Sequence, residues 1–116
     1  KSFDDVPSTL SKVLLTDLLR KDLGFNGIII SDGMEMKAIS DTYGIGEGCV
    51  MALNAGCDIL LLCHEFCEQE EAFICVKKAV LDGKITGRQT FLFHQFATYI
   101  HGQHKRIPNL TLQENL

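Results

Sequence analysis

The chain has 116 residues, of which 46% are hydrophobic, and carries a formal net charge of -4 at pH 7. The length fits one domain, and the hydrophobic share is ordinary for a globular chain that buries a core. Acidic and basic residues are interleaved, and no apolar run approaches the roughly 20 residues of a membrane-spanning helix, so we expect neither nucleic acid nor membrane as a partner.

The first predicted element is an amphipathic helix that follows Pro7-Ser8. Its apolar residues recur at helical spacing on one face and its charged residues take the other face. The apolar set is Leu10, Val13, Leu14, Leu18 and Leu19. We expect this helix to end near Gly24.

The next elements form a strand, a helix and a second strand. Residues 28–30 are three consecutive isoleucines bounded by turn residues, as expected of a strand that is buried on both faces. Residues 47–55 predict a helix closed by Gly56, and residues 58–62 are a second apolar run. A strand, helix, strand order predicts a βαβ unit with parallel strands.

Two more helices are expected after this unit. The first covers residues 68–81, with Gly83 just past its end. The second covers residues 88–101 and is rich in aromatic residues at helical spacing, which favours packing over a binding role. We therefore expect two parts, the βα units in residues 1–87 and an aromatic helix with a loose tail in residues 88–116.

Two parallel strands cannot form a stable sheet alone, because sheets usually need about three or more strands. The predicted order of elements is the one found in the last quarter of a (β/α)8 barrel, whose whole length is typically about 250 residues. The predicted fold class is therefore α/β, a C-terminal fragment of a (β/α)8 TIM barrel with two parallel strands and flanking helices.

Asp32 is the clearest candidate for a functional residue. It follows the first predicted strand, and catalytic side chains of (β/α)8 barrels lie at the C-terminal ends of strands. The alternative is an aspartate that caps the following turn, which aspartate often does. Position alone leaves both interpretations open.

Several motifs in order along residues 5–87 resemble glycoside hydrolase family 3, in particular its bacterial β-N-acetylhexosaminidase branch. The β-glucosidases of the family typically have Trp after the Ser-Asp pair, whereas Gly33 stands here, so the hexosaminidase branch fits better. The motifs are Pro7-Ser8-Thr9-Leu10-Ser11, Leu18-Leu19-Arg20, Leu23-Gly24-Phe25-Asn26-Gly27, Ser31-Asp32-Gly33-Met34-Glu35-Met36-Lys37-Ala38-Ile39 and Ala52-Leu53-Asn54-Ala55-Gly56.

The resemblance implies a retaining glycosidase that removes terminal β-linked N-acetylglucosamine through a covalent glycosyl-enzyme. Asp32 matches the nucleophile of the family, and Met36 matches a position that lines the sugar pocket, although a core methionine is the alternative there. Glu35 is expected to be solvated. The acid/base of this branch, a histidine-aspartate pair, matches no residue here, so the resemblance implies the last two βα units of a longer enzyme.

A competing hypothesis is a catalytically silent truncated fragment that acts as a structural or interaction module. Exposed sheet edges would then favour self-association. The segment Cys63-His64-Glu65-Phe66-Cys67 is incomplete as a zinc site, so we expect no metal, and no cofactor is required. The cysteines are odd in number and not spaced as a disulfide framework, which favours reduced thiols and a cytoplasmic location.

Overall fold

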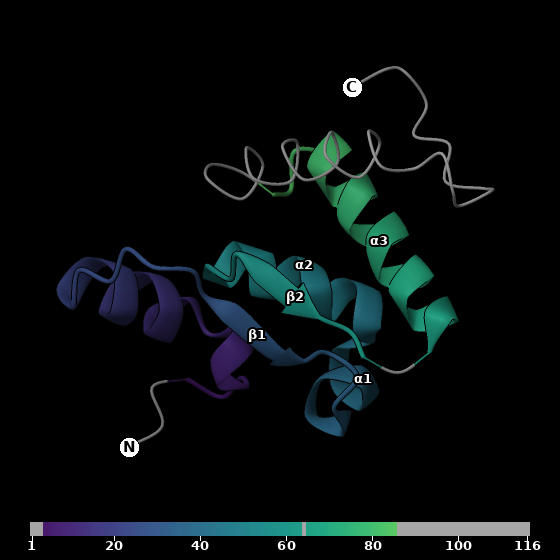
Figure 1. The fold of residues 1–116 in the computed structure, drawn as a ribbon, viewed down its shortest axis with the longest axis horizontal. Helices are drawn as coiled ribbons and strands as arrows, with labels where there is room; N and C mark the ends of the chain where they lie inside the picture. The colour runs from purple at the N-terminus through teal and green to yellow at the C-terminus, as the bar shows by residue number, and fades with distance from the viewer. Residues whose placement is uncertain (1–3, 64, 86–116) are drawn as a thin grey trace.

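The computed structural model describes residues 4–63 and 65–85. Two parallel strands run side by side through the middle of this part of the chain, with α2 behind them and the other helices beside them (Figure 1). The expected strand, helix, strand order is confirmed. The elements are η1 Ser8–Leu10, η2 Val13–Asp22, β1 Ile30–Gly33, α1 Lys37–Tyr43, α2 Ile45–Ala55, β2 Ile59–Leu61 and α3 Phe66–Leu81.

The first predicted helix is present, but it is wound as a π-helix, η2. The backbone N–H of Leu14 donates to Ser11 Oγ at 3.1 Å, so a buried serine hydroxyl caps the start. The chain leaves the helix at Gly24, whose φ of 66° lies in the left-handed region that glycine adopts at no steric cost. Val13, expected on the inner face, is instead 41% exposed.

The core lies between the helices and one face of the sheet. Helix α2 packs against α3 and against β2, and its residues Cys49, Ala52 and Ala55 are buried. The short helix α1 was not predicted from the sequence. Helix α3 begins two residues before its predicted start and ends where predicted, and it buries Ala72, Val76 and Ala79 against this core.

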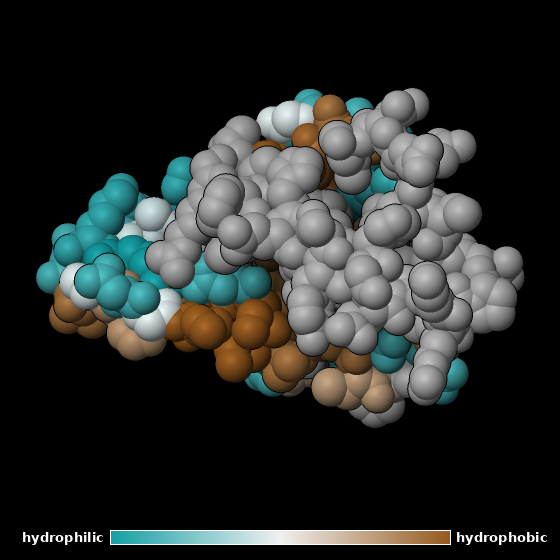
Figure 2. All heavy atoms as spheres, turned by 45° about the horizontal axis from the view of Figure 1, so that its top comes forward, coloured by the Kyte–Doolittle hydropathy of each residue, from teal (hydrophilic) through white to brown (hydrophobic). Residues whose placement is uncertain are grey.

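The strands are shifted relative to the prediction, because β1 begins at Ile30 and extends through Asp32 to Gly33. The first strand was expected to be buried on both faces, and this is wrong for the part of the chain that the structure describes. Ile29 is buried, whereas Ile30 is 55% exposed and Leu61 is 40% exposed. Figure 2 shows an apolar patch across the middle of the molecule, in the region of the two strands.

A buried ion pair fastens η2 to the N-terminal end of the sheet. Arg20 is paired with Asp58, whose side chain is only 4% exposed and also accepts the N–H of Ile29 at 2.9 Å. Arg20 also donates to the carbonyl of Phe25 at 3.1 Å. Breaking a buried pair of this kind is costly, so the N-terminal end of the sheet is held firmly.

Some predictions lie outside the described residues. These are the aromatic helix over residues 88–101, the loose tail from residue 108 and the boundary between residues 87 and 88. Within residues 4–63 and 65–85, no helix is both long enough and apolar enough to cross a bilayer.

Candidate active site

Asp32 lies inside β1, one residue before its end, rather than directly after the strand as expected. Side chains alternate along this strand, so Asp32 shares the exposed face of the sheet with Ile30 while Ser31 points to the buried side. Its Oδ1 accepts the backbone N–H of Gly33 at 2.9 Å. The carboxylate thus accepts a hydrogen bond from the next residue and still faces solvent at the C-terminal end of the sheet.

Ser31 fixes the backbone on which Asp32 stands. The strand register pairs Ile30 with Ile59 and Gly33 with Leu61, so three steps along β1 match two along β2, which is a β-bulge. The buried Ser31 Oγ accepts the backbone N–H of Leu61 at 2.9 Å and donates to the carbonyl of Asp32 at 2.7 Å. One hydroxyl therefore satisfies the N–H that the bulge would leave unpaired and holds the carbonyl of the candidate nucleophile.

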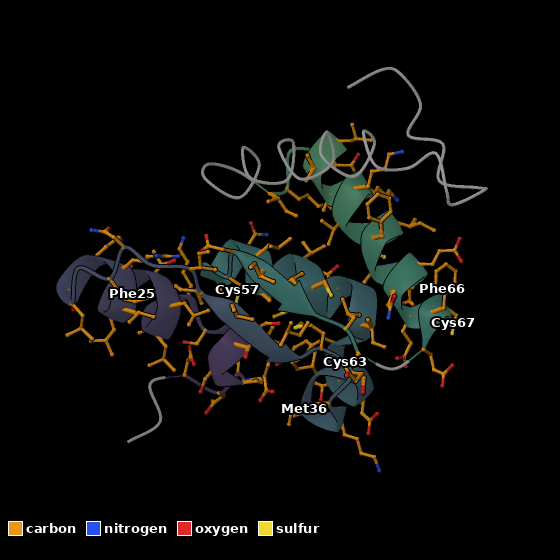
Figure 3. The ribbon with its side chains drawn as sticks, viewed as in Figure 1. Phe25, Met36, Cys57, Cys63, Phe66 and Cys67 are labelled. Atoms are coloured by element: carbon orange, nitrogen blue, oxygen red, sulfur yellow. The ribbon has the colours of Figure 1, made fainter. Side chains whose placement is uncertain are left out.

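A tight turn follows Asp32 and leads into α1. The N–H of Met36 donates to the carbonyl of Gly33 at 3.2 Å, and the carbonyl of Met36 accepts the N–H of Ile39 at 2.8 Å as α1 begins. Met36 is 49% exposed, so the core interpretation of this residue is wrong, and Met34 is the methionine that is fully buried. Figure 3 shows Met36 and Cys63 at the same end of the molecule, opposite Phe25.

The expectation that Glu35 is solvated is also wrong. Its Oε2 is buried, and its Oε1 accepts the backbone N–H of Cys63 at 3.3 Å, just after β2. A Cβ built on Gly33 would lie 3.3 Å from both Cδ and Oε1 of Glu35. The Glu35 carboxylate therefore lies over Gly33 and connects the end of β1 with the residue that follows β2 by two positions, Cys63.

Ser31 and Glu35 are the residues at this site whose roles sequence reasoning missed. A small polar residue within an apolar strand is a usable signal, because a buried hydroxyl needs a partner and a bulge provides one. Glu35 gives no such signal, since its contact joins residues 28 positions apart in the chain. Among the described residues, no group of three or more His, Cys, Asp or Glu side chains is arranged to hold a metal ion.

Burial makes two of the cysteines poor nucleophiles. It raises the pKa of the Cys49 thiol to about 12, with smaller contributions from the negative charges of Cys75, Glu71 and Glu35. Burial likewise raises the pKa of the Cys57 thiol to about 11. All five cysteines are free thiols, and only Cys63 and Cys67 are exposed. Asp32, with its exposed carboxylate near the end of β1, remains the candidate nucleophile among the described residues.

Comparison with known proteins gives matches to one family of enzymes. The family model for the glycosyl hydrolase family 3 N terminal domain matches residues 1–91. A β-hexosaminidase of Tolumonas auensis is 46% identical over 61 residues, which are 53% of this chain and 18% of that protein. A β-hexosaminidase of Haemophilus influenzae is 47% identical over 62 residues, again 53% of this chain and 18% of the relative.

A solved structure is similar over nearly the whole chain. The glycoside hydrolase family 3 β-N-acetylglucosaminidase of Paenibacillus sp. superposes with a TM-score of 0.74 at 32% identity, covering 97% of this chain and 22% of that one. The predicted fold class, two βα units of a (β/α)8 barrel, is confirmed. The chain spans about a fifth of the length of the relatives it matches.

Proposed function

Since the chain belongs to glycosyl hydrolase family 3, we propose that it carries the nucleophile of a retaining glycosidase. Asp32 is that nucleophile. The observation that carries the proposal is the exposed carboxylate near the C-terminal end of β1, on a backbone held by Ser31. Catalytic groups of (β/α)8 barrels lie at this end of the strands.

The reaction proceeds in two displacements. A carboxylate oxygen of Asp32 attacks the anomeric carbon, the bond from that carbon to the leaving oxygen breaks, and an acid outside these residues protonates the leaving group. The conjugate base of that acid then takes a proton from water, whose oxygen attacks the same carbon and releases the Asp32 carboxylate, so the configuration is retained. An aspartate suits the first role because it is ordinarily ionised at neutral pH.

The proposed substrate is a saccharide with a terminal β-linked N-acetylglucosamine. The names of the relatives, β-hexosaminidase and β-N-acetylglucosaminidase, support this choice. Met36 supports it as well, because its exposed side chain lies three residues beyond the strand and offers an apolar surface to a sugar ring. We propose Met36 as a substrate-binding residue.

The test is intact-mass measurement after incubation with a fluorinated N-acetylglucosamine derivative that carries a strongly activated leaving group. Such a reagent does not need the acid, so it reports on the nucleophile alone. We expect one glycosyl adduct on Asp32 and none on Asp32→Asn. Asp41→Asn, at an exposed aspartate of α1, is the matched control and keeps the adduct.

The second candidate function is a silent structural or interaction module. The exposed strand residues Ile30, Ile59 and Leu61, with Ile28 just before β1, favour it, because an apolar sheet face without a partner promotes association. A folded wild-type chain that forms no adduct would support this candidate and reject the first. Either function is compatible with our further proposal that isolated chains self-associate through the sheet.

We also propose a cytoplasmic location. Five free thiols support it, because a reducing compartment keeps exposed cysteines such as Cys63 and Cys67 unpaired. Fractionation of cells that produce the chain, with thiol labelling of each fraction, tests this. Recovery in an oxidised form outside the cytoplasm would contradict it.

A further inference from the structure

The segments that follow the two strands are joined by one side chain. Glu35 belongs to the segment after β1, and its Oε1 accepts the N–H of Cys63, which belongs to the segment after β2. The neighbouring backbone contact, from the N–H of Met34 to the carbonyl of Leu61 at 2.9 Å, is the last link of the strand pair. The Glu35 contact lies beyond this hydrogen bond and connects the segment before α1 with the segment before α3.

This contact also bears on the backbone next to Asp32. The Glu35 carboxyl group lies over Gly33, the residue whose N–H binds the Asp32 carboxylate. The carbonyl of Glu35 in turn accepts the hydroxyl of Ser40 in α1 at 3.3 Å. Both the carboxylate and the backbone carbonyl of Glu35 therefore hold the turn between Asp32 and Met36.

We propose that Glu35 is a positioning residue, whose carboxylate binds the Cys63 N–H and so holds the Asp32 turn against the segment after β2. The inference rests on the proposed function of Asp32. Glu35 is half-buried, its Oε2 is buried and its Oε1 is engaged with the Cys63 N–H, so its proposed role is to hold the turn and not to make bonds itself. Its effect is geometric, because a small displacement of a nucleophile slows attack strongly.

The absence of a side chain at Gly33 is part of the same arrangement. A Cβ 3.3 Å from Cδ of Glu35 would force the carboxyl group to move by a few tenths of an ångström. Gly33→Ala therefore perturbs the Glu35 contact without removing Glu35. The backbone of Gly33 does not require glycine, since its φ is not among the positive values of this chain.

The experiment measures two quantities on the full chain, the rate of adduct formation with the activated fluoro-sugar and the amide hydrogen exchange of the peptide that contains Cys63. We expect Glu35→Ala to slow labelling about tenfold, the order expected for one lost hydrogen bond to a charged group, and to speed exchange at Cys63. Glu35→Gln keeps a carbonyl acceptor and stays close to wild type in both. Gly33→Ala falls between Glu35→Ala and wild type.

The controls separate positioning from folding. Glu70→Ala, at an exposed glutamate of α3, changes neither quantity. The proposal is overturned if Glu35→Ala labels at the wild-type rate, whether or not exchange increases, or if Glu35→Gln is as slow as Glu35→Ala.

The two proposals fail in different ways. A wild-type chain that is never labelled defeats the role of Asp32, and with it any positioning by Glu35, while exchange still shows whether the contact exists. If the wild-type chain is labelled, the proposed role of Asp32 stands. The Glu35 variants alone then test the positioning role. Should Glu35→Ala fail to fold, Gly33→Ala decides the outcome: a wild-type labelling rate in that variant overturns the positioning role.

Discussion

At the scale of single residues, burial decides what a polar side chain does. Ser31 and Asp32 are neighbours, yet the hydroxyl of Ser31 is used within the sheet and the carboxylate of Asp32 faces solvent. A buried hydroxyl that lost its contacts would leave the Leu61 N–H unpaired, at a cost of about 1–3 kcal/mol. The structural and the chemical role are thus separated by one residue.

Burial also makes stability depend on pH through Cys49. The pKa of this thiol is about 12 in the folded chain against 9.0 for an ordinary cysteine, so its contribution to folding stability is complete below pH 9 and is lost as the pH rises toward 12. We expect the stability advantage of wild type over Cys49→Ala to shrink by about 1 kcal/mol between pH 8 and pH 10. Urea titration at the two pH values measures it.

The control for this prediction is Val50→Ala, a truncation at the neighbouring buried position that removes no ionisable group. Its difference from wild type should be the same at both pH values, because other titrating groups cancel in the comparison. A Cys49→Ala difference that stays constant with pH would contradict the prediction.

At the scale of elements, the most extensive packing within the described residues is between α2 and α3. Gly46, in the first turn of α2, has no side chain, and the side chain of Cys75 in α3 occupies that space. A Cβ at position 46 would lie 2.9 Å from Cβ of Cys75, which is closer than real contacts allow. The two helices can approach only because position 46 is glycine.

We expect Gly46→Ala to destabilise the chain by about 1–3 kcal/mol, the usual cost of overpacking, although alanine favours helix formation. Adding Cys75→Ala should recover part of the loss, because it removes the sulfur and leaves the Cβ contact. Urea titration of the two single variants and the double variant gives the coupling energy. Purely additive effects would mean that the two residues do not meet.

At the scale of the whole molecule, the exposed sheet face leaves the described part of the fold incomplete. In a closed barrel, such a face points to the interior and is covered by other strands. Here Ile28 is 62% exposed and Ile59 is 43% exposed. An isolated chain therefore keeps apolar surface in water that its fold family buries.

We expect the isolated chain to self-associate, and Ile30→Lys to reduce this because a charge on the apolar face opposes burial against a second copy. Sedimentation velocity over a wide concentration range measures the association. Thr42→Lys, at an exposed position in α1, adds the same charge away from the sheet and serves as control. A wild-type chain that is a monomer at every concentration would refute the expectation.

The sequence by itself determined the order of the two strands, α2 and α3, the parallel pairing, the ends of α2 and α3 and the placement of Asp32 near the C-terminal end of a strand. These features depend on local periodicity, on glycine at helix ends and on motifs whose spacing is preserved. The family could be named from the same motifs. Residues close in the chain carry all of this information.

Only the tertiary structure decided the bulge at Ser31, the contact of Glu35 with Cys63, the π-helical winding of η2 and the exposure of one sheet face. The bulge and the placement of Glu35 depend on contacts between distant residues, Ser31 with Leu61 and Glu35 with Cys63. A pattern of apolar residues shows that a strand can be buried. Whether it is buried depends on which other elements are present to cover it.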